Sequence, residues 1–176
     1  STRWMSLSEA GLSEADGEGK TMKKLINDPA RYVDESLDGL VLGYPDRYRR
    51  VGTRGRVIAR HHVKKAGLVG VASGGGFGHL PLFAGYVGHG LLDTCAVGDV
   101  FAGPSLDSVI ESLQAADRGA GVLAVIGNYG GDKMAFSMAT EELQPAGLKV
   151  ETVLVTDDVA SAPPGERGKR RGVAGT

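Results

Sequence analysis

The chain has 176 residues, 41% of them hydrophobic, and its 20 basic and 21 acidic side chains give a formal net charge of −1. This length suits one domain, and the near-neutral charge argues against non-specific nucleic-acid binding, which needs a positive field. No apolar run reaches the roughly 18 residues of a membrane span, the first residues lack an apolar signal-peptide centre, and the single cysteine excludes an internal disulfide framework. We therefore expect a cytoplasmic protein that binds neither nucleic acid nor membranes.

The first 20 residues are polar and acidic, and we expect them to form a flexible tail ahead of one domain over residues 21–176. Near the start of that domain, hydrophobic residues at mainly helical spacing predict a helix. Asp28 can cap its amino end and Pro29 suits the first helical position, whereas Gly43 and a following proline end it.

Short apolar runs predict strands further along the chain. Residues 48–60 hold one or two of them, and His61 and His62 are expected at the surface, on opposite sides of a strand. The later strands are predicted at 66–73, 92–98, 121–128 and 148–158, and helices at 80–88, at 105–118 and within 129–147. Ser105 is expected to cap the helix that follows it, and Cys95 to lie in the core.

Strands that alternate with loops and helices predict an α/β fold, with a mainly parallel sheet flanked by helices. In such sheets, ligands bind outside the carboxyl ends of the strands. Glycine-rich or acidic segments follow the four later strands, at residues 73–79, 98–104, 127–132 and 156–158. We therefore expect these segments to converge on one edge of the sheet and to form a ligand site there.

The first of these segments belongs to the stretch VASGGGFGHLP, residues 71–81, in which four glycines precede His79. A dinucleotide fingerprint would need a glycine where Pro81 stands, and the GKT at residues 19–21 lacks the preceding strand and the first glycine of a P-loop. No histidine or cysteine group has zinc spacing, and Ser73 does not lie in the GxSxG turn of serine hydrolases. These chemistries are therefore not favoured.

What remains is a loop of backbone N–H groups beside His79, with Asp132 on a neighbouring loop. Successive exposed N–H groups can bind an oxyanion, a phosphate or a hydroxyl oxygen. An imidazole can take up a proton near neutral pH, and a carboxylate can orient it or share the task. This combination suits a small polyhydroxylated ligand. The alternative is a plain glycine turn in which His79 caps the next helix.

Five longer stretches are more specific than these short patterns. They are MKKLINDP, LVGVASGGGFGHLPLFAGYVGHGLLDTCAVGDVFAGPS, GAGVLAVIGNYGGDKMAFSMATEEL, VETVLVTDDVA and RRGVAGT. In their content and order, the chain resembles the first α/β domain of the substrate-binding K subunit of dihydroxyacetone kinases. The resemblance covers residues 22–176, and we expect the domain to be truncated relative to the family. A further histidine, which holds the ketone covalently in the family, has no counterpart among these residues.

The resemblance implies that the chain binds dihydroxyacetone or a related short ketose, whose hydroxyl is then phosphorylated, as in a ketose kinase. It also implies that this chain binds no cofactor itself, because ATP or ADP and magnesium belong to a separate helical kinase domain or subunit. That partner takes its phosphoryl group from ATP or from a phosphotransferase relay. A homodimer is expected. The alternative is a non-catalytic relative that senses the ketose and acts as a regulator.

The same resemblance implies a set of substrate-binding residues. They are Gly75, Gly76, Phe77, Gly78, His79 and Asp132. His79 would help with proton transfer, and Asp132 would activate the hydroxyl that is phosphorylated. The sequence departs from the family at Phe77, Leu80 and Gly127, where the family has serine, glutamate and a lysine that contacts substrate. We expect the Phe77 ring to decide which ketose fits.

Overall fold

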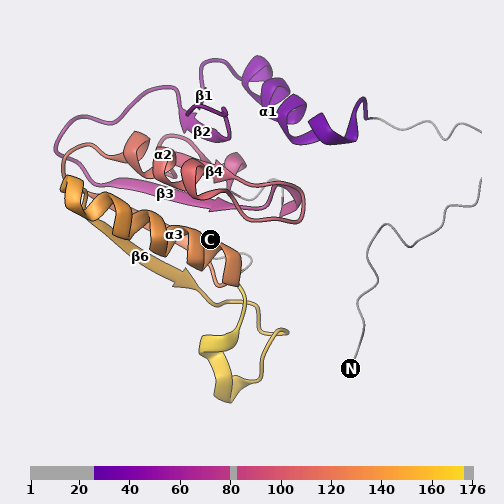
Figure 1. Ribbon diagram of the computed structural model, residues 1–176, viewed down its shortest axis with the longest axis vertical. Coiled ribbons are helices and arrows are strands. Elements are labelled where there is room, and N and C mark those ends of the chain that lie inside the picture. Colours follow the sequence, from indigo (N-terminus) through magenta and orange to yellow (C-terminus); the bar gives the residue numbers. More distant parts are fainter. Residues whose placement is uncertain (1–25, 80–82, 173–176) are drawn as a thin grey trace, which may run out of the picture.

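One mixed sheet of six strands organises the chain (Figure 1), and the computed structural model describes residues 26–79 and 83–172. The strands are β1 Tyr48–Val51, β2 Val57–Arg60, β3 Gly70–Gly75, β4 Thr94–Val97, β5 Val122–Gly127 and β6 Val150–Val155, in the order β1-β2-β4-β3-β5-β6. Strands β4, β3, β5 and β6 run parallel, whereas β1 and β2 pair antiparallel. The predicted mainly parallel α/β sheet is therefore confirmed, and the predicted tail lies outside the described residues.

Three helices cover the two faces of this sheet. They are α1 Tyr32–Gly43, α2 Leu106–Ala116 and α3 Gly130–Leu143. Helices α2 and α3 lie beside each other on one face (Figure 1), where their apolar side chains pack with Ala96 of β4. The neighbouring Cys95 and Val97 point to the opposite face and pack with α1, because successive side chains of a strand alternate. No helix in the described part is long and apolar enough to cross a membrane.

Two predicted caps are found at the helix starts. The Asp28 carboxylate accepts a hydrogen bond of 2.9 Å from the Ala30 N–H, at a short 3-10 turn that leads into α1. Ser105 Oγ accepts a bond of 3.3 Å from the Ser108 N–H at the start of α2. Each cap satisfies an amide that has no partner inside its helix, so both helix starts were predicted correctly from the sequence.

The helix predicted at residues 80–88 is wrong in its described part, which holds only a 3-10 turn at Ala84–Tyr86. Phe83 has a φ of 63°, outside the helical region. The backbone beyond the turn pairs with Leu92 instead: the Gly88 N–H donates to the Leu92 carbonyl, and the Leu92 N–H donates to the Tyr86 carbonyl. These bonds replace those that a longer helix would make.

The two adjacent histidines are both exposed, as predicted, but they do not point to opposite sides of a strand. Strand β2 ends at Arg60, so the alternation of a strand does not apply to the residues that follow. The His61 and His62 rings instead meet edge to face, with their centroids 5.0 Å apart.

Candidate functional site

The four parallel strands end at the same edge of the sheet. Gly75 of β3 lies opposite Val97 of β4, and Gly127 of β5 lies opposite Val155 of β6. The loops that follow these strands also touch one another. A Cβ atom on Gly76 would lie 3.2 Å from the carbonyl oxygens of Asp99 and Ala102, both in the loop after β4. The predicted convergence of the strand ends is thus what the structure shows.

The glycine loop packs backbone against backbone on residues 98–104. The Phe77 N–H donates to the Asp99 carbonyl at 2.9 Å, and the Gly78 N–H donates to the Val100 carbonyl at 3.0 Å. A side chain at Gly78 would collide with that carbonyl, so glycine permits the close approach. These two N–H groups are therefore already bonded within the protein and do not form the exposed row of donors that the sequence pattern indicated.

The Phe77 ring lies in the core rather than beside His79. Its side chain is 4% exposed and packs with the apolar residues between the sheet and α1. The ring meets Tyr32 of α1 edge to face, with centroids 5.7 Å apart. Gly75 is similarly enclosed, because a side chain there would collide with the Phe83 ring. Phe77 and Gly75 therefore lie on the core side of the glycine loop.

Asp132 and His79 are brought together, as the sequence predicted. Asp132 lies in the first turn of α3 and is 6% exposed, whereas His79 is exposed on the glycine loop. A Cβ atom on Gly103 would lie 2.5 Å from Asp132 Oδ1, so the carboxylate sits directly against the backbone of the loop after β4. Among residues 26–79 and 83–172, no group donates a hydrogen bond to this carboxylate.

The protonation of Asp132 reflects this setting. Burial raises its pKa to about 6, and the nearby charge of His79 opposes the rise. A carboxylate with such a pKa is mostly ionised at neutral pH, yet it is a stronger base than an exposed aspartate. The carboxylate can therefore accept a proton from a ligand hydroxyl placed beside it.

Tyr129 contacts His79, and Arg171 contacts Tyr129 in turn; neither role was predicted from the sequence. The Tyr129 ring lies against His79 with centroids 5.8 Å apart, and the Arg171 guanidinium lies 5.7 Å from the centroid of the Tyr129 ring. A Cβ atom on Gly127 would lie 3.0 Å from the Tyr129 ring, so the ring occupies space beside the position where the family has lysine. The available signal was the aromatic residue directly before the glycines that precede Asp132.

The basic segment 166–171 is fixed to this site. The Asn128 side-chain amide donates to the carbonyls of Gly168, at 3.0 Å, and Arg170, at 2.7 Å. The Arg171 N–H in turn donates to Ser161 Oγ at 2.9 Å. These bonds hold Arg171 near Tyr129, although the two residues are far apart in the sequence.

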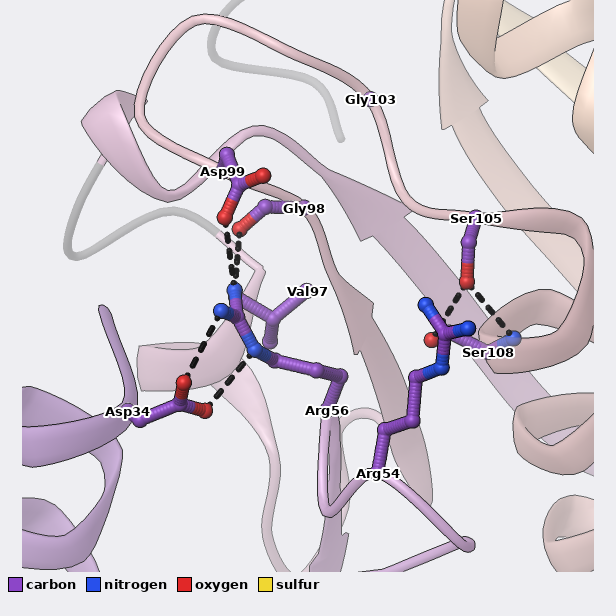
Figure 2. A pocket seen from close by; sticks show the side chains of 9 residues that line it. All are labelled: Asp34, Arg54, Arg56, Val97, Gly98, Asp99, Gly103, Ser105 and Ser108. Atoms are coloured by element: carbon purple, nitrogen blue, oxygen red, sulfur yellow. Dashed lines mark hydrogen bonds and ion pairs between the residues drawn. The ribbon is translucent and has the colours of Figure 1, made fainter. Parts of the chain in front are cut away.

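An arginine-lined cavity lies beside residues 98–104 (Figure 2). Asp99 closes one side of it, since its carboxylate pairs with Arg56 at 3.0 Å while its carbonyl holds the glycine loop. Asp99 therefore braces the neighbouring loop. Within the described residues, no three histidine, cysteine or acidic side chains come together as metal ligands.

The sheet order and the site at the strand ends define an α/β ligand-binding domain, and comparison with known proteins gives its family. Residues 38–176 match the Dak1 domain, so the chain belongs to the Dak1 domain family. This confirms the resemblance to dihydroxyacetone kinases seen in the sequence motifs.

Two curated relatives show which proteins the chain resembles. It is 47% identical over 156 residues to the dihydroxyacetone-binding subunit DhaK of a PTS-dependent dihydroxyacetone kinase from Listeria innocua, covering 88% of this chain and 46% of that protein. It is 45% identical over 154 residues to a D-erythrulose kinase from Mycolicibacterium smegmatis, covering 88% of this chain and 26% of the relative. The chain thus spans less than half the length of either protein.

A solved structure has the same fold. The dihydroxyacetone kinase from C. freundii, crystallised in complex with AMP-PNP and Mg²⁺, superposes with a TM-score of 0.78 at 35% identity. The match covers 87% of this chain and 28% of that chain. The mixed sheet described above is therefore the fold of this family.

Proposed function

We propose that the chain is the ketose-binding part of a dihydroxyacetone-type kinase, with the site built around His79 and Asp132. The observation that carries the proposal is the Asp132 carboxylate, which is buried, receives no hydrogen bond from the described residues and lies within the electrostatic reach of His79. The names of the relatives, dihydroxyacetone and erythrulose kinases, support a short ketose as substrate.

In the proposed reaction, Asp132 accepts the proton of the ketose hydroxyl as that oxygen bonds to the phosphorus of the donor. The bond from phosphorus to the donor breaks, and the product is a ketose phosphate. Phosphoryl transfer depends mainly on positioning and charge, so one carboxylate beside the attacking hydroxyl suffices as the base. His79 stays beside the carboxylate and favours its ionised form.

We propose that the donor is held by a separate helical domain or subunit that binds ATP or ADP with magnesium. The description of one relative as a dihydroxyacetone-binding subunit of a PTS-dependent kinase supports this division of labour. The backbone supports it too, because the Phe77 and Gly78 N–H groups already donate to the carbonyls of Asp99 and Val100 and are not available to a phosphate.

We further propose a homodimer in the cytoplasm. The exposed β6 edge supports association, since Val153 and Leu154 on this strand are 48% and 44% exposed. Native mass spectrometry checks it: a dimer mass is expected, and a monomer across the concentrations tested would contradict it.

The test of function combines binding and turnover. Calorimetry with dihydroxyacetone and both erythrulose enantiomers identifies the ketose, and phosphorylation is then assayed with an ATP-dependent helical partner or with phosphotransferase proteins. Asp132→Asn is expected to lower the rate about 10²–10⁴-fold, the usual contribution of a positioned base. Asp107→Asn is the matched control, because Asp107 lies in the first turn of α2 and is exposed.

Each outcome decides between the alternatives. Failure of all three ketoses to bind would refute the proposed substrate class. Binding without phosphorylation by either kind of partner would refute the kinase and favour a ketose-sensing protein. An Asp132→Asn variant as active as Asp107→Asn would remove Asp132 from the reaction.

A further inference from the structure

The arginine cavity beside the proposed ketose site has a volume of about 490 Å³. It is bounded by the turn between β1 and β2, by the loop after β4 and by the start of α2 (Figure 2). Gly103 lines it and also touches Asp132, so only the backbone of this loop separates the cavity from the carboxylate. None of the residues assigned to ketose binding lines the cavity.

The two arginines of the cavity differ in their partners. Arg56 is bonded to Asp34 at 2.9 Å and to Asp99 at 3.0 Å, so its charge is balanced by the two carboxylates that line this side. Arg54 forms no ion pair or hydrogen bond within the described residues. Figure 2 shows the Arg54 side chain reaching away from these carboxylates, toward Ser105 and Ser108. Arg54 is exposed, and its positive charge faces the open side of the cavity without a counter-ion among the described residues.

The serines opposite Arg54 add hydroxyl groups to the wall of the cavity. Ser105 Oγ and Ser108 Oγ lie 2.9 Å apart, and one of these hydroxyls donates to the other. Ser108 is 2% exposed and is satisfied by this bond, whereas Ser105 is exposed. The Ser105 hydroxyl therefore remains accessible to an acceptor in the cavity.

We propose that the arginine cavity binds the phosphate group of a small ligand, between Arg54 and the start of α2. A phosphate supplies acceptors for the guanidinium fork and for the exposed Ser105 hydroxyl, and the positive end of the α2 dipole favours its charge. The cavity falls in the usual range for small-molecule sites, roughly 300–1,000 Å³, which leaves room for more than the phosphate itself. The inference stands without the proposed ketose site, because it uses different residues.

Calorimetry on the whole chain tests the proposal, with inorganic phosphate, dihydroxyacetone phosphate and ADP as separate titrants. At least one is expected to bind, and Arg54→Ala is expected to weaken it about tenfold, as for the loss of one charged hydrogen-bonding group. Arg54→Lys should have a smaller effect, and Arg54→Glu a larger one. The titrant that binds most tightly shows whether the phosphate comes as the free ion, on a ketose or on a nucleotide.

Arg31→Ala provides the control, because it removes the same charge from an exposed arginine outside the cavity. It should bind the titrant as the unchanged chain does. Amide NMR during the titration should show shifts at residues 105–108. The proposal is overturned if no titrant binds, if Arg54→Ala and Arg31→Ala weaken binding equally, or if the shifts centre on His79 and Asp132 instead. Circular dichroism verifies that each variant is folded.

Discussion

Two aspartates are almost equally buried but lie in opposite surroundings. Asp93 is 5% exposed and Asp132 is 6% exposed. The Asp93 carboxylate accepts from Lys64 Nζ at 2.6 Å, the Val71 N–H at 2.8 Å and Arg60 at 3.1 Å. The Asp132 carboxylate accepts no hydrogen bond within the described part. We therefore expect burial without donors, rather than burial alone, to mark a reactive carboxylate.

The positions of the two residues explain this difference. Asp93 directly precedes β4, at the amino end of the parallel strands, where its partners tie neighbouring segments together. Asp132 follows β5, at the carboxyl end, where ligands bind in such sheets. At one edge of the sheet the buried charge ties segments together, and at the other we propose that it takes part in chemistry.

Removal of the Asp93 charge should change the free energy of unfolding more than any other test of this contrast. Asp93→Asn should lower the free energy of unfolding by about 3–5 kcal/mol, because it leaves the Arg60 and Lys64 charges without their buried partner. Asp132→Asn should cause no such loss near neutral pH. Urea unfolding of both variants measures the two values. Equal destabilisation would contradict the distinction drawn between the two sites.

The next prediction concerns the pH dependence of the free energy of unfolding. The expected effect is somewhat smaller than that of Asp93→Asn, and it has the opposite sign because loss of the Asp132 charge stabilises the folded chain. Because burial raises the Asp132 pKa to about 6, the folded state holds this proton more tightly than the unfolded state does. The contribution of Asp132 to stability is therefore present at low pH and is lost as the pH rises from about 4 to about 6, by up to about 3 kcal/mol.

Unfolding curves at several pH values, measured for the unchanged chain and for Asp132→Asn, isolate this contribution by difference. The Asn variant should be the more stable of the two above pH 6. A difference that does not vary with pH would mean that Asp132 titrates alike in the folded and unfolded chain.

The smallest effect concerns the ring beside His79. Tyr129→Leu should reduce ketose phosphorylation about tenfold through misplacement of the imidazole, whereas Tyr129→Phe should keep most of the activity because the contact is made by the ring. The His79 ring proton shifts report the placement without any turnover. Unchanged shifts in Tyr129→Leu would show that the ring does not position His79.

The sequence predicted those features that depend on neighbours in the chain. Asp28 and Ser105 cap helices through local bonds, and the strand ends follow from the alternation of apolar runs and glycine turns. The pairing of His79 with Asp132 was predicted because both follow parallel strands and match family motifs.

The remaining features depend on contacts between distant segments, which local patterns do not encode. The Phe77 ring packs on α1, and the Phe77 and Gly78 N–H groups bond to the loop after β4, so the exposed cradle expected from the glycines does not form there. Arg171 lies over the Tyr129 ring although α3 and β6 separate the two residues in the sequence. These contacts could be recognised only once the packing of the distant segments was known.

The close packing of the glycine loop on residues 98–104 also bears on how substrate range can vary in this family. A wall made of peptide groups presents the same surface whatever the surrounding side chains are, and at Gly78 and Gly103 it leaves no room for a side chain to alter it. Relatives whose names specify dihydroxyacetone and erythrulose therefore need not differ in this wall. If the proposed function holds, we expect the choice of ketose to depend on side chains outside this wall, because those can mutate without separating the two loops.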